Sequence, residues 1–371
     1  MQKVWTRNRA GTPGSLTCSP VSERPEIHQI VLPLSSATSG GPFSAPANVQ
    51  IYLIDSQPLT LIDTGPRTLA SRAQLEAALE ELGHAFVDIE RVVVTHAHRD
   101  HMGLVQSIRD AGADLECLVH EADAPVVEAF SEDVRRRLAE LRPLFSEYGV
   151  PEELVLHMYD ELVDSLVVDE AEGEATSVDR VLREGDRIEW KEFAFDVRHS
   201  PGHTAGHILL EDQELGLLFT GDQIMGQAIP YAENFYQGEL PDPSDPLRRR
   251  PRFRGLVELR QSLRRLRGRP YKVFLPGYGG VIRRTDRAIR DTLLHYDVRL
   301  QRIDRGLRHL AAMDQDVTAF EIWKALFPVD ESPVDMCSHM LMLIGALDCL
   351  EDDGKLVTER RPDGVLTHHH R

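Results

Sequence analysis

The 371-residue chain has few cysteines, no long apolar run and no disulfide-type cysteine spacing. None of its four cysteines belongs to a CxxC pair: they are Cys18, Cys117, Cys337 and Cys349. We therefore expect free thiols and a reducing, cytoplasmic location. No stretch of eighteen consecutive apolar residues occurs, so no membrane-spanning helix is expected.

Basic residues are too few for a general nucleic-acid binder. The chain holds 42 Lys and Arg against 60 Asp and Glu, a formal net charge of −18. Binding to phosphate groups needs Lys and Arg, so nucleic acid is not an expected partner. Residues 248–269 are an exception, with ten arginines and a single acidic residue, Glu258. This stretch either meets an anionic small molecule such as a coenzyme A, or forms a solvated face that pairs with acidic neighbours.

One short segment concentrates metal-ligand chemistry. Three imidazoles and a carboxylate fall within six residues: His96, His98, Asp100 and His101. They follow residues 91–94, an apolar run that indicates a short buried β-strand. Side chains alternate along an extended chain, so His96 and His98 leave the strand end on the same side. Neutral imidazoles and a carboxylate are the ligands of a catalytic Zn²⁺ or a similar metal.

This segment resembles the HxHxDH signature of the metallo-β-lactamase superfamily, and three further segments fit the same family. The second, third and fourth segments carry Asp63, His203 and Asp222 within residues 61–65, 200–207 and 219–222. Each follows an apolar or alternating run, which places its polar residue at a strand end where loops converge. The order and spacing of the four segments agree over residues 28–280.

The resemblance implies two metal sites, the first of which would hold zinc firmly. Site 1 would use His96, His98 and His203, and site 2 would use Asp100 and His101 and share Asp222. Asp63 would orient ligands without binding the metal.

The last family ligand is a His in a Pro-Gly-His-Gly segment, and this chain has Tyr278 there. A phenol has a pKa of about 10 and ligates only after losing its proton. Site 2 is therefore expected to be weak, Tyr-ligated or empty.

The resemblance also implies an α+β fold, the four-layer αββα sandwich, and a metal-dependent hydrolase of a small molecule. A zinc-bound hydroxide would attack an ester, thioester or lactone-like carbonyl. Asp100 would orient or deprotonate the water, and Tyr278 would stabilise the oxyanion. Redox di-iron relatives carry Glu where His98 stands, so oxygen chemistry is not expected.

Three alternative functions stay open. The first is an endoribonuclease or phosphodiesterase of the same fold. The second is a non-catalytic or regulatory protein with a degenerate metal site. The third is a dehydratase- or cyclase-like use of the same site.

Two further histidines lie close to these segments. His120 ends a predicted strand, and His207 begins the strand that follows His203. Either could face the site, although a histidine taken alone is more often a satisfied core or surface residue.

The remaining patterns divide the chain into three parts. Residues 1–27 are predicted to be a flexible leader, residues 28–283 the catalytic domain, and residues 284–371 a helical linker with a further module. Within the catalytic domain, helical periodicity at about 121–166 predicts an insertion that caps the metal pocket, and the proline-rich residues 226–252 predict a long loop near the site.

The C-terminal part has the pattern helix, helix, hairpin, with the hairpin turn at residues 362–364. This order resembles a winged-helix module, and a similar appended module occurs in the lactamase-beta-like-protein 2 group. Residues 313–371 contain five Lys or Arg and twelve Asp or Glu, a local charge of −7 that opposes DNA binding. The module is therefore expected to pack against the catalytic domain or a second subunit, and a homodimer stays open.

Overall fold

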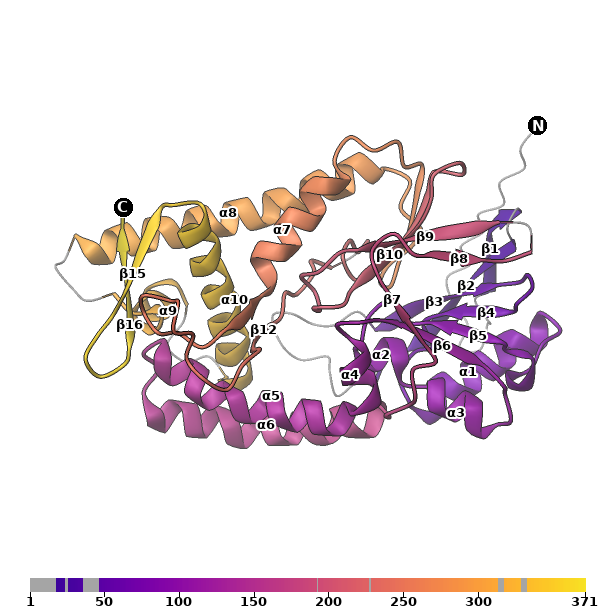
Figure 1. Cartoon of the computed structure of the whole chain (residues 1–371), viewed down its shortest axis with the longest axis horizontal. Helices are drawn as coiled ribbons and strands as arrows, with labels where there is room; N and C mark the ends of the chain where they lie inside the picture. The colour runs from indigo at the N-terminus through magenta and orange to yellow at the C-terminus, as the bar shows by residue number, and fades with distance from the viewer. Residues whose placement is uncertain are drawn as a thin grey trace.

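Two β-sheets organise the chain, and Figure 1 shows them toward the right of the view. The computed structural model describes residues 18–23, 26–35, 47–191, 193–226, 228–312, 317–327 and 332–371. The first sheet has seven strands in chain order: β1 (Cys18–Glu23), β2 (Glu26–Pro33), β3 (Asn48–Ile54), β4 (Thr60–Ile62), β5 (Arg91–Val93), β6 (Glu116–His120) and β7 (Arg180–Leu182). Neighbours are antiparallel from β1 to β4 and parallel from β4 to β7.

The second sheet has five strands in the order β14-β11-β10-β9-β8. They are β8 (Arg187–Glu189), β9 (Ala194–His199), β10 (Ile208–Asp212), β11 (Leu217–Gly221) and β14 (Val273–Pro276). Only the pair β11 and β14 is parallel, and the other neighbours are antiparallel.

The alternation of apolar side chains along β11 shows how the layers stack. Leu217 and Phe219 lie in the core between the two sheets, with residues of both. Leu218 points the other way, into the core shared with helices α7 (Gly255–Leu266) and α8 (Thr285–Ala311). On the outer face of the first sheet lie α1 (Leu69–Glu81) and α3 (Val105–Asp110). This gives the predicted order of layers, helix, sheet, sheet, helix.

The predicted insertion is helical. It comprises α4 (Ala124–Glu128), α5 (Phe130–Glu147) and α6 (Glu152–Glu172), so it extends a little beyond residue 166. Helices α5 and α6 lie side by side along the lower edge of the molecule in Figure 1 and reach the C-terminal part.

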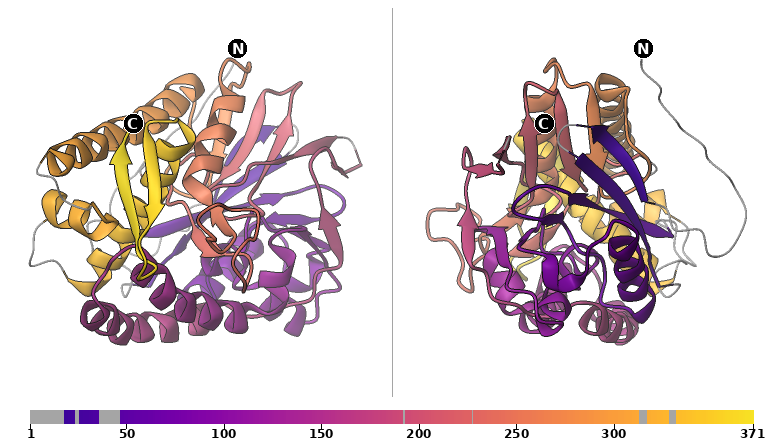
Figure 2. Two further views of the ribbon diagram at one scale, coloured as in Figure 1. Left: turned by 60° about the vertical axis from the view of Figure 1, so that its left-hand side comes forward. Right: turned by 90° about the vertical axis from the view of Figure 1, so that its right-hand side faces the viewer.

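The C-terminal part follows the predicted order of elements. After α8 come α9 (Ala319–Leu326), α10 (Pro333–Asp352) and a hairpin of β15 (Leu356–Arg360) with β16 (Leu366–His370). Helix α10 packs against α6, α7 and α8, so this part contacts both the insertion and the helix α7 that covers the second sheet. These elements gather at the end of the molecule opposite the first sheet (Figures 1 and 2).

Two predictions for connecting segments need adjustment. Residues 1–17 of the predicted leader lie outside the described residues, but residues 18–23 form the edge strand β1, which pairs with β2. The predicted long loop contains a strand, β12 (Asn234–Tyr236), which pairs with β13 (Arg252–Arg254) beyond the loop. Strands β1 and β12 are each held by backbone hydrogen bonds to a partner strand, and the order of residue types along the chain does not reveal such pairing.

Most arginines of the arginine-rich stretch, residues 248–269, form ion pairs with acidic residues of the same chain. Arg250 pairs with Glu140 of α5, and Arg252 pairs with Asp348 of α10 at 2.6 Å. Further pairs are Arg249 with Glu351, Arg260 with Asp297 and Arg269 with Glu211. Of the two interpretations of this stretch, the structure favours pairing with acidic neighbours over contact with an anionic small molecule.

No helix in the described part of the chain is long and apolar enough to span a bilayer. Cys117, Cys337 and Cys349 are free and buried.

Candidate metal centre

The six predicted ligands come together at the edge where both sheets end. His96 and His98 follow β5, and the short helix α2 (Arg99–Met102) carries Asp100 and His101. His203 and Asp222 lie in the loops after β9 and β11. Ligand atoms lie within 4.8 Å of one another in two groups: His96 with His98 and His203, and His96 with His101 and Asp222.

The carboxylate of Asp222 lies between the two groups. Its Oδ1 is 3.4 Å from His101 Nε2, and its Oδ2 is 3.5 Å from His203 Nε2. His96 Nε2 and His98 Nδ1 are 3.1 Å apart, and Asp100 Oδ2 is 3.6 Å from His101 Nε2. One carboxylate thus faces both groups, as a bridging ligand does.

Three of these atoms are buried without a hydrogen-bond partner among the described residues: His101 Nε2, His203 Nε2 and Asp222 Oδ1. A buried polar atom left unsatisfied costs about 1–3 kcal/mol, so native structures rarely leave several together. All three face the same small volume, and a cation there would satisfy all of them. The donor set therefore fits a metal of the zinc class.

Asp63 fixes two of the imidazoles. Its Oδ2 accepts from His101 Nδ1 at 2.8 Å, so the lone pair of His101 lies on Nε2. The same oxygen accepts from Thr95 Oγ1 at 2.8 Å, and Thr95 Oγ1 lies 3.0 Å from His96 Nδ1. Because the hydroxyl donates to the carboxylate, it accepts from His96, whose Nε2 is then the free nitrogen.

The other two imidazoles are fixed by groups that the sequence did not single out. Glu233 Oε1 lies 3.2 Å from His98 Nε2, which must donate and leaves Nδ1 free. The backbone carbonyl of Tyr231 accepts from His203 Nδ1 at 2.7 Å and leaves Nε2 free. In all four histidines the nitrogen that is not held by a fixed partner points into the centre, the arrangement found around bound metals.

Burial and charge act in opposite directions on the ligands. Burial lowers the pKa of His203 to about 4 and that of His96 well below its usual value. Burial also disfavours protonation of His101, but Asp222, Asp100 and Asp63 together raise its pKa well above the usual value. Burial raises the pKa of Asp100, but His101 and other cations outweigh it and hold that pKa at about 2. The centre therefore offers both neutral imidazoles and charged carboxylates.

The backbone approaches this centre closely. A Cβ on Gly277 would lie 2.3 Å from Asp222 Oδ1 and 2.7 Å from His101 Cε1, so only glycine fits there. Asp63 has a φ of 62°, a left-handed conformation that is uncommon outside glycine. A strained backbone conformation of this kind persists where the surrounding contacts hold the residue in place.

Tyr278 contacts the second group of ligands through Asp100. Its hydroxyl donates a hydrogen bond to Asp100 Oδ2, and the residue is 7% exposed. Burial, with the charges of Asp100 and Asp222, raises the pKa of Tyr278 well above its usual value. The phenol is therefore a neutral donor, which favours the donor role over the ligand role expected for a Tyr-bound metal.

The two additional histidines have different surroundings. His207 is fully buried, its Nε2 accepts from the backbone N–H of Asp222 at 3.1 Å, and its ring stacks on His96. It therefore supports the loop that carries Asp222. His120 stacks on His199 at 4.0 Å between ring centroids and belongs to neither group of ligands.

Two cavities open from the centre. The insertion cavity, of about 460 Å³, runs from His98 and Asp100 beneath the apolar side chains Phe130, Leu138 and Leu141 of α5. The α8 cavity, of about 950 Å³, runs from His203 and Asp222 along α8. Tyr231, Asn234, Tyr278 and Leu341 line both cavities and so form the wall between them.

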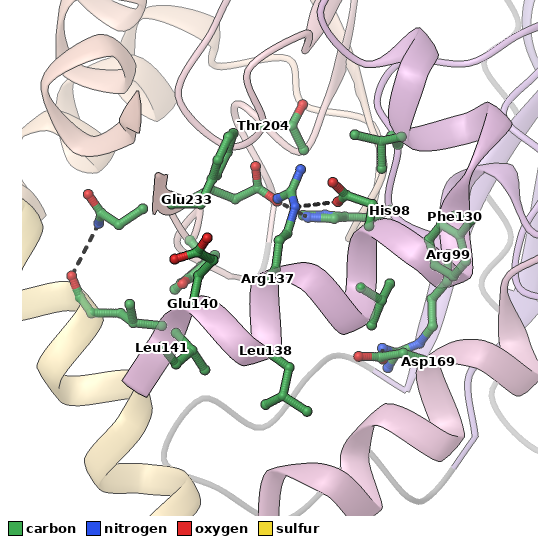
Figure 3. A pocket seen from close by; sticks show the side chains of 18 of the residues that line it. His98, Arg99, Phe130, Arg137, Leu138, Glu140, Leu141, Asp169, Thr204 and Glu233 are labelled. Carbon is green, nitrogen blue, oxygen red and sulfur yellow. Dashed lines mark hydrogen bonds and ion pairs between the residues drawn. The ribbon is translucent and has the colours of Figure 1, made fainter. Parts of the chain in front are cut away.

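A charged contact links the insertion to the centre. Figure 3 shows Arg137 of α5 reaching toward Glu233, which in turn contacts His98. Arg137 also pairs with Asp133. Burial raises the pKa of Glu233, but the Arg137 guanidinium outweighs it and lowers that pKa to about 2. Glu233 is thus held as a carboxylate next to a ligand histidine.

Comparisons with known proteins agree with this geometry. A family model described as the metallo-beta-lactamase superfamily matches residues 45–278. The probable metallo-hydrolase YqjP of Bacillus subtilis is 29% identical over 321 residues, which cover 84% of this chain and 89% of that protein. A hydroxyacylglutathione hydrolase of Thermosynechococcus vestitus is 26% identical over 163 residues, which cover 44% of this chain and 46% of that protein.

Two solved structures share the fold over nearly the whole chain. A metallo-beta-lactamase family protein from Thermus thermophilus has a TM-score of 0.66 and 24% identity, covering 93% of this chain and 98% of that one. A beta-lactamase domain protein from Burkholderia ambifaria has a TM-score of 0.69 and 19% identity, covering 98% of each chain. Their similarity therefore includes the insertion and the C-terminal part.

Proposed function

The chain belongs to the metallo-beta-lactamase superfamily, and from that premise we propose that it is a zinc-dependent hydrolase of small-molecule esters or thioesters. One observation carries the proposal: four imidazoles direct a free nitrogen into one buried centre while their other nitrogens are held by fixed partners. The relatives support hydrolysis, because one is named a probable metallo-hydrolase and another a hydroxyacylglutathione hydrolase.

The firm zinc site would use His96, His98 and His203, with Asp222 facing a second site that includes Asp100 and His101. When bound there, zinc supplies Lewis acidity, which polarises a carbonyl and lowers the pKa of water to about 7. Asp63 and Glu233 would hold the ligand histidines in the required tautomers.

Asp100 and Tyr278 would act together at this centre. A carboxylate with a pKa of about 2 is a weak base at neutral pH, so Asp100 orients a water molecule better than it deprotonates one. The neutral phenol of Tyr278 fixes Asp100 and lies at the wall between both cavities, where a substrate carbonyl would pass.

The insertion cavity supports a small substrate with an apolar part. Its floor is formed by leucines and Phe130 of α5, and its volume suits a drug-sized molecule. Acidic side chains outnumber arginines around it, which opposes binding of a phosphodiester. Arg250 and Arg252 of the arginine-rich stretch are paired internally, so this stretch does not favour the nuclease alternative. The free, buried cysteines are in keeping with a cytoplasmic location.

The test is hydrolysis by zinc-loaded and chelator-treated protein on one panel. The panel contains a hexanoyl thioester of N-acetylcysteamine, p-nitrophenyl butyrate, a homoserine lactone, bis-p-nitrophenyl phosphate and single-stranded RNA. We expect cleavage of the thioester or the ester, lost on chelation and in His203→Ala. His309→Ala, a change at an exposed histidine far along α8, should leave the rate unchanged.

Two outcomes would overturn the proposal. Cleavage of only the phosphodiester or the RNA would assign a nuclease. Absence of hydrolysis by protein with a full complement of zinc would favour a non-catalytic role.

A further inference from the structure

The α8 cavity differs in charge from the insertion cavity, although both open on the same centre. Around the insertion cavity there are seven carboxylates and two arginines, Arg99 and Arg137, both of which are in ion pairs. Around the α8 cavity there are three arginines, Arg284, Arg287 and Arg299. Only one carboxylate other than the predicted ligand Asp222 faces them, Asp291. The two ends of a substrate would therefore meet opposite electrostatic environments.

Two of these arginines lack an acidic partner in the described part of the chain. Arg287 pairs with Asp291 at 3.1 Å, but no ion pair engages Arg284 or Arg299. Arg284 is exposed, whereas Arg299 is half-buried, and burial lowers the pKa of Arg299. A desolvated guanidinium normally has a carboxylate or phosphate partner, because an unpaired cation inside a protein is costly. The unpaired, half-buried Arg299 on the cavity wall therefore indicates an anion from outside the chain, and the exposed Arg284 and Arg287 line the same cavity.

A third polar group points to the same conclusion. His295 lines the α8 cavity one turn before Arg299, and its Nε2 is buried without a hydrogen-bond partner among the described residues. The net charge of the chain is −18, so a general attraction for anions is absent and a local one needs placed cations.

The cavity is also long. Arg284, Arg287, Asp291, His295 and Arg299 recur every three or four residues, so they form one stripe along α8. From Thr285, the first residue of the helix, to Arg299 the helix rises about 21 Å at 1.5 Å per residue. A groove of that length suits an extended molecule.

We propose that the α8 cavity binds the anionic carrier of the substrate, an extended phosphate- or carboxylate-bearing leaving group, through Arg284, Arg287 and Arg299. The apolar acyl group then occupies the insertion cavity, and the scissile carbonyl lies between them at the wall that contains Tyr278. This inference rests on the proposed hydrolase function and adds the substrate class to it.

The test compares three thioesters that share a hexanoyl group: hexanoyl-coenzyme A, hexanoyl-glutathione and the neutral N-acetylcysteamine thioester. In the double variant Arg284→Gln/Arg299→Gln we expect kcat/KM for an anionic thioester to fall about 10- to 100-fold, mainly through KM. The value for the neutral thioester should change less than about twofold. Arg290→Gln, an exposed arginine of α8 that lines neither cavity, is the matched control.

The coenzyme A and glutathione arms distinguish a phosphate-bearing from a carboxylate-bearing carrier. Equal losses on the charged and neutral thioesters would overturn the proposal, as would an effect of Arg290→Gln as large as that of the double variant. Unchanged thermal unfolding of the double variant excludes misfolding as the cause.

A binding measurement separates this inference from the proposed function. S-methyl-coenzyme A and S-methylglutathione lack a free thiol and are titrated calorimetrically into the zinc-loaded protein. We expect one of them to bind, and the double variant to weaken it at least about 10-fold. If an analogue binds through the arginines but no thioester is cleaved, the proposed hydrolase function is wrong and the proposed anion-binding role of the α8 cavity stands. If the neutral thioester is cleaved but neither analogue binds, the hydrolase function stands and the anion-binding role of the α8 cavity is wrong.

Discussion

Glu233 is the residue that links the metal centre to the helical insertion. It accepts a hydrogen bond from His98 and forms an ion pair with Arg137, so one negative charge holds both side chains in place. Glu233→Gln removes that charge and leaves Arg137 short of a partner, and we expect zinc affinity to fall about 10- to 100-fold. Competition with a chromophoric chelator measures this. Glu140→Gln, at a carboxylate of the same cavity that pairs with Arg250, should leave affinity unchanged. Equal affinity in both variants would contradict the assignment.

Tyr278 occupies the position where the family resemblance calls for histidine, and its hydroxyl donates to Asp100 Oδ2. That oxygen is the one nearest His101 Nε2, so the phenol competes with any second metal for it. We expect Tyr278→Phe to keep the first zinc and to raise occupancy of the second site. Tyr278→His should raise it further by adding a nitrogen ligand. Elemental analysis at matched free zinc tests both, and a lower second occupancy in Tyr278→Phe would instead mark the phenol as a ligand.

The residues that gather at the candidate centre could be picked out from the sequence because each lies in a short segment at a strand end. His96, His98, Asp100 and His101 need only local geometry to come together. Glu233 carries no such signal, because it contacts His98 across 135 residues of chain from a proline-rich segment. Its role depends on the path of that segment, which long-range packing decides.

At the scale of elements, an ion pair that is largely shielded from solvent joins α10 to β13. Arg252 and Asp348 are 9% and 5% exposed at their side chains. Asp348→Ala leaves the guanidinium buried without its carboxylate, and we expect a loss of about 3–5 kcal/mol in the free energy of unfolding. Urea unfolding measures it. Glu76→Ala breaks the exposed pair with Arg72 and should cost less than about 1 kcal/mol. Similar small losses in both would show that α10 is held by apolar packing alone.

The elements themselves were predictable where periodicity is strong. The long insertion helices α5 and α6, helix α8 and the C-terminal hairpin follow from apolar spacing and turn residues. The strands β12 and β13 did not, because three residues are too few to show alternation and their partners lie 16 or more residues apart. Strand β1 likewise depends on pairing with β2 rather than on a pattern of its own.

The whole molecule contains several histidines that folding keeps neutral. Burial lowers the pKa of His203 and His120 to about 4 and that of His368 to about 3, against about 6.5 when unfolded. The unfolded chain therefore takes up protons as the pH falls from about 6.5 to 4, while the folded chain does not, and stability falls. His101 acts in the opposite sense, because its raised pKa adds stability at low pH that is lost as the pH rises through that pKa.

Taken together, the pKa shifts of these groups predict that the metal-free protein is less stable to unfolding in acid than at neutral pH. We expect the urea midpoint of chelator-treated protein to be lower at about pH 5 than at about pH 7.5. A further decrease should follow below about pH 4.5, because Asp100 and Glu233 have pKa values of about 2 when folded and their contribution is lost as the pH falls toward that value. A midpoint that does not change between these two pH values would show that His101 cancels the other histidines.

Asp63 has one more consequence, which concerns the two proposed sites together. A single oxygen of this carboxylate fixes His101 directly and His96 through Thr95. A mutation of Asp63 that released His101, of the proposed second site, would release His96, of the proposed first site, as well. Asp63 therefore couples the two proposed sites, and a change at this residue would affect both of them. Tyr278, by contrast, contacts Asp100 and His101 of the proposed second site, so a substitution there can alter that site without loosening His96.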